Sequence, residues 1–252
     1  MSEILSVTDL CKTFIIRQNS NNVLCNINFT MQEGEFVSVM GPSGSGKSTL
    51  LYTVSGMDTP TSGEVKFCGK TISAMPQKEL TQLRLREMGF IFQQMYMMKK
   101  LCILDNIILP GYQAGGNRKA VNQRAEMLMR RLGIIETAGH EIKEVSGGEL
   151  QRACLCRALI NEPKIIFADE PTGALNSKAA GDVMRELIIA NNAGTGILMV
   201  THSEHVAAQS ERVIYLVDGG IQGELQLGKL TEPSELGARE RRLHTWLSNL
   251  GW

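Results

Sequence analysis

Apolar residues in the first third of the chain follow the pattern of β-strands. Between residues 23 and 31 every second position is apolar: Val23, Cys25, Ile27, Phe29 and Met31. This alternation predicts a strand with one buried face. Further strands are expected at residues 35–40, 63–67 and 89–92, with an exposed helix at 77–86. The first third of the chain is therefore expected to be rich in β-structure.

The pattern becomes helical between residues 95 and about 160. Ala125, Leu128, Met129 and Leu132 recur at the spacing of one helix face. Beyond this segment, strands are expected at 165–168, 196–201 and 213–217, alternating with helices at 179–190 and 204–210. Such alternation is typical of a mostly parallel sheet covered by helices. The patterns predict an α/β domain over residues 1–230, with a helical insertion at about 95–160, and a short C-terminal tail at 231–252.

Composition narrows the classes of function. The 26 basic residues equal the 26 acidic ones among 252, so the net charge gives no reason to expect a nucleic-acid partner. We find neither an apolar run long enough to span a membrane nor a signal peptide. The six cysteines form no C-x-x-C pair and are expected to be reduced thiols. These features predict a cytoplasmic protein, whose membrane partner, if it has one, is another chain.

One glycine-rich segment carries a phosphate-binding pattern. The run Gly41-Pro42-Ser43-Gly44-Ser45-Gly46-Lys47-Ser48-Thr49 fits G-x-x-x-x-G-K-[ST] and follows an apolar strand. Glycines allow backbone N–H groups to approach phosphate oxygens, and the helix that starts near Lys47 directs its positive end at them. Lys47 is expected to reach the β- and γ-phosphates of ATP, and Ser48 to ligate Mg²⁺.

Two acids end the apolar strand that starts at Ile165. A carboxylate at the carboxyl end of a parallel strand faces the phosphate crevice, so Asp169 is expected to hold Mg²⁺ through water. Glu170 is placed to polarise the attacking water as general base. Ser146 is expected to cap a helix that opens with the run S-G-G-x-x-x-R. Because the chain already holds one phosphate loop, this second phosphate-binding surface suggests a partner copy's nucleotide.

These motifs resemble, in number, order and spacing, those of the ATP-binding cassette (ABC) ATPases. The family's Q-loop matches Phe92-Gln93, its signature matches residues 146–152, and its H-loop histidine matches His202. The resemblance covers roughly residues 3–222. It implies the P-loop NTPase fold of ABC ATPases, in which a RecA-like core carries an N-terminal antiparallel β-subdomain and an inserted α-helical subdomain.

The resemblance also implies roles for individual residues. ATP is expected to contact Phe14, through stacking on adenine, and residues 41–49. Across a homodimer it is expected to contact Ser146, Gly147, Gly148 and Glu149 of the second copy. The implied Mg²⁺ ligands are Ser48, Gln93 and Asp169, and the implied catalytic residues are Glu170, His202 and Gln93. One position departs from the family: Asn176 stands where the D-loop usually carries aspartate, and the change removes a charge.

Less specific motifs suggest a subgroup of the ABC ATPases. Residues 89–93 and 170–175 are similar to the MacB, LolD and lantibiotic-exporter cassettes, and residues 212–228 and 246–251 are similar to bacitracin-resistance (BceA-like) cassettes. This implies ATP hydrolysis that powers a separate FtsX-like permease at the inner face of the membrane, for antimicrobial-peptide export or resistance. Some such transporters also signal to a sensor kinase.

Other classes of cassette stay open. They are an FtsE-type regulator of cell-wall hydrolysis, a LolD-type lipoprotein-release cassette and an iron–sulfur assembly cassette. A translation-factor cassette would need two ATPase halves, and a repair ATPase would need a long coiled coil between its motifs. As a further hypothesis, the permease docks on the run Met95-Tyr96-Met97-Met98 and on residues 99–110, because methionine clusters suit adaptable interfaces.

Overall fold

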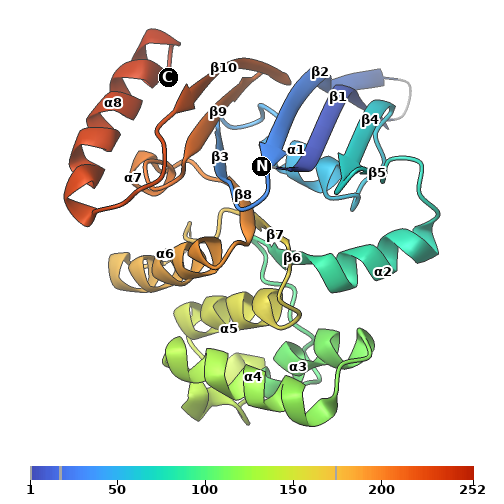
Figure 1. The fold of residues 1–252 in the computed structure, drawn as a ribbon, viewed down its shortest axis with the longest axis vertical. Helices are drawn as coiled ribbons and strands as arrows, with labels where there is room; N and C mark the ends of the chain where they lie inside the picture. The colour runs from blue at the N-terminus through green and yellow to red at the C-terminus, as the bar shows by residue number, and fades with distance from the viewer. Residues whose placement is uncertain (1, 17–18, 174) are drawn as a thin grey trace.

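An N-terminal antiparallel sheet forms one edge of the protein. The computed structural model describes residues 2–16, 19–173 and 175–252. Four strands form this sheet in the order β2-β1-β4-β5 (Figure 1). Their bounds are Glu3–Ile16 for β1, Asn19–Gln32 for β2, Ser62–Phe67 for β4 and Lys70–Thr71 for β5. All neighbouring strands in it are antiparallel, as the family resemblance implied.

The buried face of β2 changes phase within the strand. Ile27, Phe29 and Met31 are buried as the alternation predicted, but Leu24 is buried in place of Cys25, which is exposed. The pairing with β1 shifts register between Leu24 and Ile27, and Asn26 takes a positive φ of 51°. A bulge adds one residue to a strand and so moves the following side chains to the other face. The prediction for Cys25 was therefore wrong.

A second, six-stranded sheet forms the core. Its order is β10-β9-β3-β8-β7-β6, and its strands are parallel except β10. The bounds are Phe36–Met40 for β3, Met88–Ile91 for β6, Ile165–Asp169 for β7, Gly196–Val200 for β8, Arg212–Val217 for β9 and Gly220–Gln226 for β10. Every residue of β3, β7 and β8 is buried. The predicted parallel sheet, covered on both faces, is confirmed.

The helices follow the predicted alternation. Around the core lie α1 (Lys47–Val54), α2 (Gln77–Glu87), α6 (Ser177–Asn192) and α7 (Glu204–Ala207). The expected helical insertion is a separate lobe in Figure 1, made of α3 (Ile103–Gln113), α4 (Arg118–Arg131) and α5 (Gly147–Leu159), with the short turns η1 (Ile135–Thr137) and η2 (Ile142–Glu144). The predicted fold, an α/β core with an antiparallel sheet and a helical insertion, is confirmed.

Helix α7 is shorter than predicted. It ends at Ala207 rather than at Ser210. Side chains take the carbonyls that a further turn would use: Ser210 Oγ donates to the carbonyl of Ala207, and Arg239 donates to those of Ala208 and Ser210. These donors satisfy carbonyls that the end of the helix leaves without intrahelical partners.

The expected C-terminal tail is mostly helix. After η3 (Pro233–Glu235), helix α8 runs over Leu236–Asn249. Its buried Leu243 and Leu247 pack with Val213 and Tyr215 of β9, and Figure 1 shows α8 lying beside α7 and β9. Within the described ranges, no helix is both long and apolar enough to cross a bilayer.

Candidate nucleotide site

The glycine-rich loop connects buried strand β3 to helix α1. Gly46 precedes the helix at φ 99°, and a Cβ there would lie 2.7 Å from the carbonyl oxygen of Val23. At Gly41 a Cβ would lie 2.0 Å from the carbonyl oxygen of Leu216. Only glycine therefore fits these two positions, since any side chain would collide with neighbouring backbone. The loop is held against the sheet with its amides close to the helix start, as a phosphate cradle requires.

Lys47 bends back over this loop. Its Nζ donates to the carbonyls of Gly41 at 2.9 Å and of Pro42 at 2.8 Å. Burial lowers the pKa of Lys47, while the nearby carboxylates of Glu170 and Asp169 act in the opposite direction. The ammonium group is thus confined at the loop mouth by weak neutral acceptors, which a phosphate oxygen can replace.

Asp169 ends β7 behind the loop and is only 2% exposed. Ser48 Oγ donates to its Oδ1 at 2.9 Å, and Tyr52 Oη donates to its Oδ2 at 2.7 Å. Tyr52 lies outside the glycine-rich motif and was not predicted to take part in the site. The available signal was its position four residues after Ser48, which places both side chains on one face of α1.

A magnesium ion fits the chemistry of this corner. A hydroxyl and a carboxylate are hard oxygen donors, and Mg²⁺ completes its shell with water and nucleotide phosphates. Over the residues that the structure describes, no group of three or more His, Cys, Asp or Glu could hold a metal by itself. That agrees with an ion that is shared between Ser48, Asp169 and a bound nucleotide.

Glu170 and His202 follow neighbouring parallel strands, β7 and β8. His202 Nε2 lies 3.5 Å from Glu170 Oε1. That oxygen is buried and has no hydrogen-bond partner among the described residues. Burial raises the pKa of Glu170 above its ordinary value. Burial, followed by the nearby Lys47, lowers the pKa of His202. The pair therefore offers a carboxylate with increased proton affinity beside a histidine that stays neutral at neutral pH.

A cavity of about 290 Å³ brings together nine of the predicted site residues, while Gly41, Pro42 and Ser45 of the loop are not in its wall. Its walls come from the glycine-rich loop, α1, β2 and the ends of β6, β7 and β8: Val23, Ser43, Gly44, Gly46, Lys47, Ser48, Thr49, Gln93, Glu170, Val200 and His202. Asp169 lies behind Ser48 rather than in this wall. Phe14 is absent from the wall; its ring, 38% exposed, lies 4.8 Å from Lys12 Nζ on β1.

The predicted signature residues lie elsewhere, at the start of α5. Ser146 Oγ accepts a hydrogen bond from the amide of Glu149 at 3.3 Å, and Glu149 Oε2 accepts from the amide of Ser146 at 2.8 Å. This capping box confirms the predicted N-cap. Ser146 and Gly147 are exposed, and neither they nor Gly148 and Glu149 line the 290 Å³ cavity of their own chain.

Asn176, which stands at the position of the usual D-loop aspartate, has a structural role in this chain. Asn176 caps α6, where its Oδ1 accepts a hydrogen bond from the amide of Ala179 at 2.9 Å. Aspartate would make the same bond with a charge added. Ala174, also part of this motif, lies outside the described residues.

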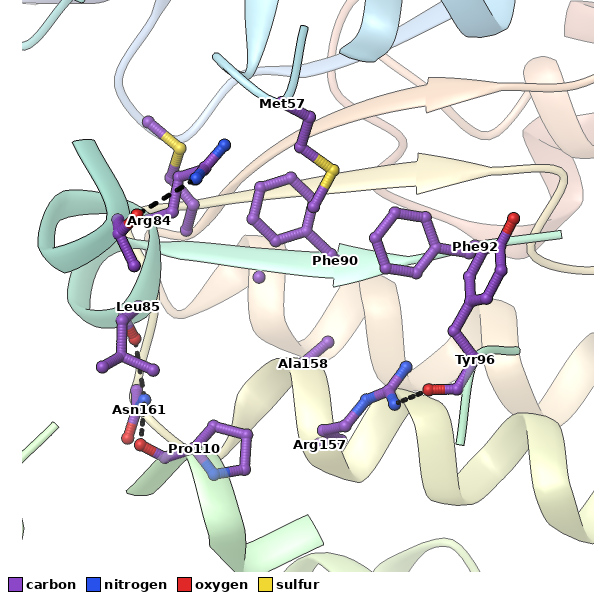
Figure 2. Close-up of a pocket in the computed structure, with 13 residues that line it drawn as sticks. Met57, Arg84, Leu85, Phe90, Phe92, Tyr96, Pro110, Arg157, Ala158 and Asn161 are labelled. Carbon is purple, nitrogen blue, oxygen red and sulfur yellow. Dashed lines mark hydrogen bonds between the residues drawn. The ribbon is translucent and has the colours of Figure 1, made fainter. Parts of the chain in front are cut away.

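A second, larger groove separates the core from the helical lobe. It encloses about 520 Å³ between α2, β6, α3 and α5. Figure 2 shows the rings of Phe90, Phe92 and Tyr96 along one side of it. Arg157 holds this side in place by donating to the carbonyls of Tyr96 and Met95, each at 2.8 Å. The groove thus begins directly beside the Q-loop residue Gln93.

Comparison with known proteins identifies the family. The family model described as ABC transporter matches residues 24–173. The chain belongs to the ABC transporter family. It is 41% identical over 225 residues to the lipoprotein-releasing system ATP-binding protein LolD of Aquifex aeolicus, covering 89% of this chain and 99% of LolD. It is also 41% identical over 226 residues to the bacitracin export ATP-binding protein BceA of Halalkalibacterium halodurans, covering 89% of each.

A solved ABC cassette has the same fold. The dimeric, post-hydrolysis structure of the ATP-binding cassette MJ0796, bound to ADP and Pi, matches with a TM-score of 0.85 and 36% identity, covering 90% of this chain and all of that one. The predicted ABC-type ATPase is confirmed, as is its relation to the group that contains LolD and BceA. Equal identity to those two leaves the narrower BceA assignment a prediction.

Proposed function

We propose that this ABC ATPase powers a separate FtsX-like permease that exports or confers resistance to antimicrobial peptides. The observation that supports this choice is the share of each relative's length that the match covers. The match covers 89% of both this chain and BceA, whereas it covers 99% of LolD. BceA, like this chain, thus extends beyond the matched region by about a tenth of its length, and LolD does not.

The described geometry supports a division of roles around ATP. Lys47 exchanges the carbonyls of Gly41 and Pro42 for phosphate oxygens. Ser48, Asp169 and Gln93 would hold Mg²⁺, and the ion would supply positive charge beside the phosphates. Glu170 takes the proton of the attacking water, and its raised pKa favours this step. His202 orients that water from its place beside Glu170.

The second half of the site comes from another copy of the chain. Ser146, Gly147, Gly148 and Glu149 stand exposed or half-exposed at a helix N-terminus, away from their own cavity, where they can meet a partner's γ-phosphate. Phe14, an exposed residue near the end of β1, stacks on adenine. The dimer of MJ0796 is a precedent for such a pairing.

The permease docks at the groove of Figure 2 and holds the ATPase at the cytoplasmic face of the membrane. Tyr96, which lines this groove, is 63% exposed, and Met98, two residues on and outside the groove lining, is 55% exposed, while Met97 packs on the helical lobe. Tyr96→Ala is expected to weaken assembly with the permease and to abolish permease-stimulated hydrolysis. Met127→Ala, on exposed α4 outside the groove, is the matched control. Intact stimulation in the Tyr96 variant would contradict this docking site.

A lipoprotein-release role is the second candidate, because LolD is as similar as BceA. The two are separated by the substrate that stimulates the complex. The subunit is purified with its permease in lipid nanodiscs, and ATPase activity is measured with bacitracin, a lantibiotic or an acylated lipoprotein. We expect the peptides to raise activity and the lipoprotein to have no effect. The reverse result would favour the LolD-type role, and co-purification of a sensor kinase would support a signalling output.

A further inference from the structure

Tyr52 contacts the carboxylate of Asp169 from the same helix as Ser48. The two hydroxyls reach different oxygens: Ser48 donates to Oδ1 at 2.9 Å and Tyr52 to Oδ2 at 2.7 Å. Asp169 is 2% exposed, so solvent does not compete for these bonds. With one donor on each oxygen, the plane of the carboxylate is fixed relative to α1.

The hydroxyl of Tyr52 is the donor of this bond, because a phenol carries a proton to donate and an ionised carboxylate can only accept.

The ring of Tyr52 is held by aromatic neighbours. Its centroid lies 6.2 Å from that of Phe92, which stacks on Phe90 at 5.8 Å and meets Tyr96 edge-on at 5.3 Å. Figure 2 shows Phe90, Phe92 and Tyr96 side by side along the groove. Aromatic pairs at these separations restrict one another. The hydroxyl is thus aimed at Asp169 by packing that does not involve the nucleotide cavity.

We propose that Tyr52 is a positioning residue for Mg²⁺ at this site. Its hydroxyl anchors Oδ2 of Asp169 and so orients the carboxylate beside Ser48. The inference rests on the proposed function, in which Ser48 and Asp169 would hold Mg²⁺. If Ser48 served as a ligand, Tyr52 would be the donor that keeps the carboxylate of Asp169 oriented.

Partners that orient a metal ligand commonly change metal affinity or activity about 10–100-fold when removed. Tyr52→Phe deletes the hydroxyl and keeps the ring, so its contact with Phe92 survives. The measurement is the dissociation constant of a fluorescent ATP analogue, with Mg²⁺ and with EDTA. The dissociation constant in EDTA divided by the constant with Mg²⁺ reports how much the ion strengthens nucleotide binding.

We expect Tyr52→Phe to lower this ratio about 10-fold or more and to leave the constant in EDTA unchanged. Tyr112→Phe is the control, because it deletes a hydroxyl that donates to Asn122 in the helical lobe, and it is expected to match the parent. Asp169→Asn tests the proposed function, and it is expected to lose most of the Mg²⁺ effect.

Each other outcome overturns a defined statement. If Tyr52→Phe has the same ratio as the parent, while Asp169→Asn loses the effect of Mg²⁺ on nucleotide binding, the role of Tyr52 is overturned and that of Asp169 stands. A parental ratio in Asp169→Asn removes Asp169 as a Mg²⁺ ligand and the inference with it. Weaker binding of Tyr52→Phe in EDTA, to the same degree as with Mg²⁺, assigns Tyr52 to structure rather than to the ion.

Discussion

At the scale of single residues, the chemistry of Glu170 depends on its surroundings. Its side chain is only 13% exposed and lies 3.5 Å from His202 and close to Lys47. We expect Glu170→Gln to bind ATP and to hydrolyse it about 10²–10⁴-fold more slowly, because the proton acceptor is gone while the shape remains. Unhydrolysed ATP should then hold two copies together. Phosphate release and gel filtration with Mg²⁺-ATP measure both effects.

A contrasting variant makes this result specific. Lys47→Ala should lose nucleotide affinity and stay monomeric in the same gel filtration, because its contacts to the phosphates are lost first. If Glu170→Gln hydrolyses ATP at nearly the parental rate, Glu170 is not the base. His202 then becomes the leading candidate for positioning the water.

The raised pKa of Glu170 also predicts a pH effect on stability. The folded protein holds this proton more tightly than the unfolded chain does, because burial disfavours the carboxylate. The stabilisation is complete below the ordinary pKa of a glutamate, about 4.5, and is lost as the pH rises through the raised value. Glu170→Gln cannot ionise, so it should be more stable than the parent at pH 7 and equal to it below about pH 4. Urea unfolding of both proteins without nucleotide, from pH 4 to 8, measures the difference; equal stability throughout would contradict it.

At the scale of elements, α8 is tied to the segment that follows the H-loop. Arg239, on α8 and 8% exposed, donates to the carbonyls of Ala208 and Ser210 at 2.8 and 2.6 Å. Arg239→Met should lower the free energy of unfolding by about 3 kcal/mol, because buried carbonyls lose charged donors. Helix α7 begins two residues after His202, so loosening it should displace His202. We therefore expect kcat to fall while the KM for ATP stays unchanged.

The exposed neighbour Arg242 is the matched control for this prediction. Arg242→Met changes the same side chain on the same helix without loss of a buried bond, and it should behave like the parent in urea unfolding and in steady-state ATPase assays. Similar unfolding curves for the Arg239 and Arg242 variants would show that α8 contributes little to holding α7.

At the scale of the whole molecule, the proposed site is complete only in a dimer. Lys47→Ala and Ser146→Arg should each be nearly inactive, because each damages a different half of both sites. Mixed together they should recover part of the parental rate, at most about half, since a mixed dimer holds one complete site of its two. Phosphate release measures the recovery, and thermal melts check that both variants fold. No recovery on mixing would contradict a site shared between copies.

The sequence by itself determined those parts of the site whose chemistry needs neighbouring residues. A phosphate loop needs glycines, a lysine and a helix start in one run, and residues 41–49 supply all of them. The acids at 169 and 170 follow from a strand that ends at the sheet edge, and the cap at Ser146 from its place before a helix. Matched order and spacing of these motifs identified the family, and the parallel core follows from the alternation of strands and helices.

Tertiary structure alone decided the contacts between distant residues. The bond from Tyr52 to Asp169 joins positions 117 residues apart. The spacing of Tyr52 from Ser48 places both on one face of α1, but it does not indicate which distant residue Tyr52 contacts. The bulge at Asn26 exposes Cys25, which the alternation had placed on the buried face of β2. It was not predicted because no sequence pattern indicated the one-residue shift in register. Helix α8 became part of the core through Arg239 and two leucines, since its docking depends on carbonyls and apolar surface that exist only once α7 and β9 are in place.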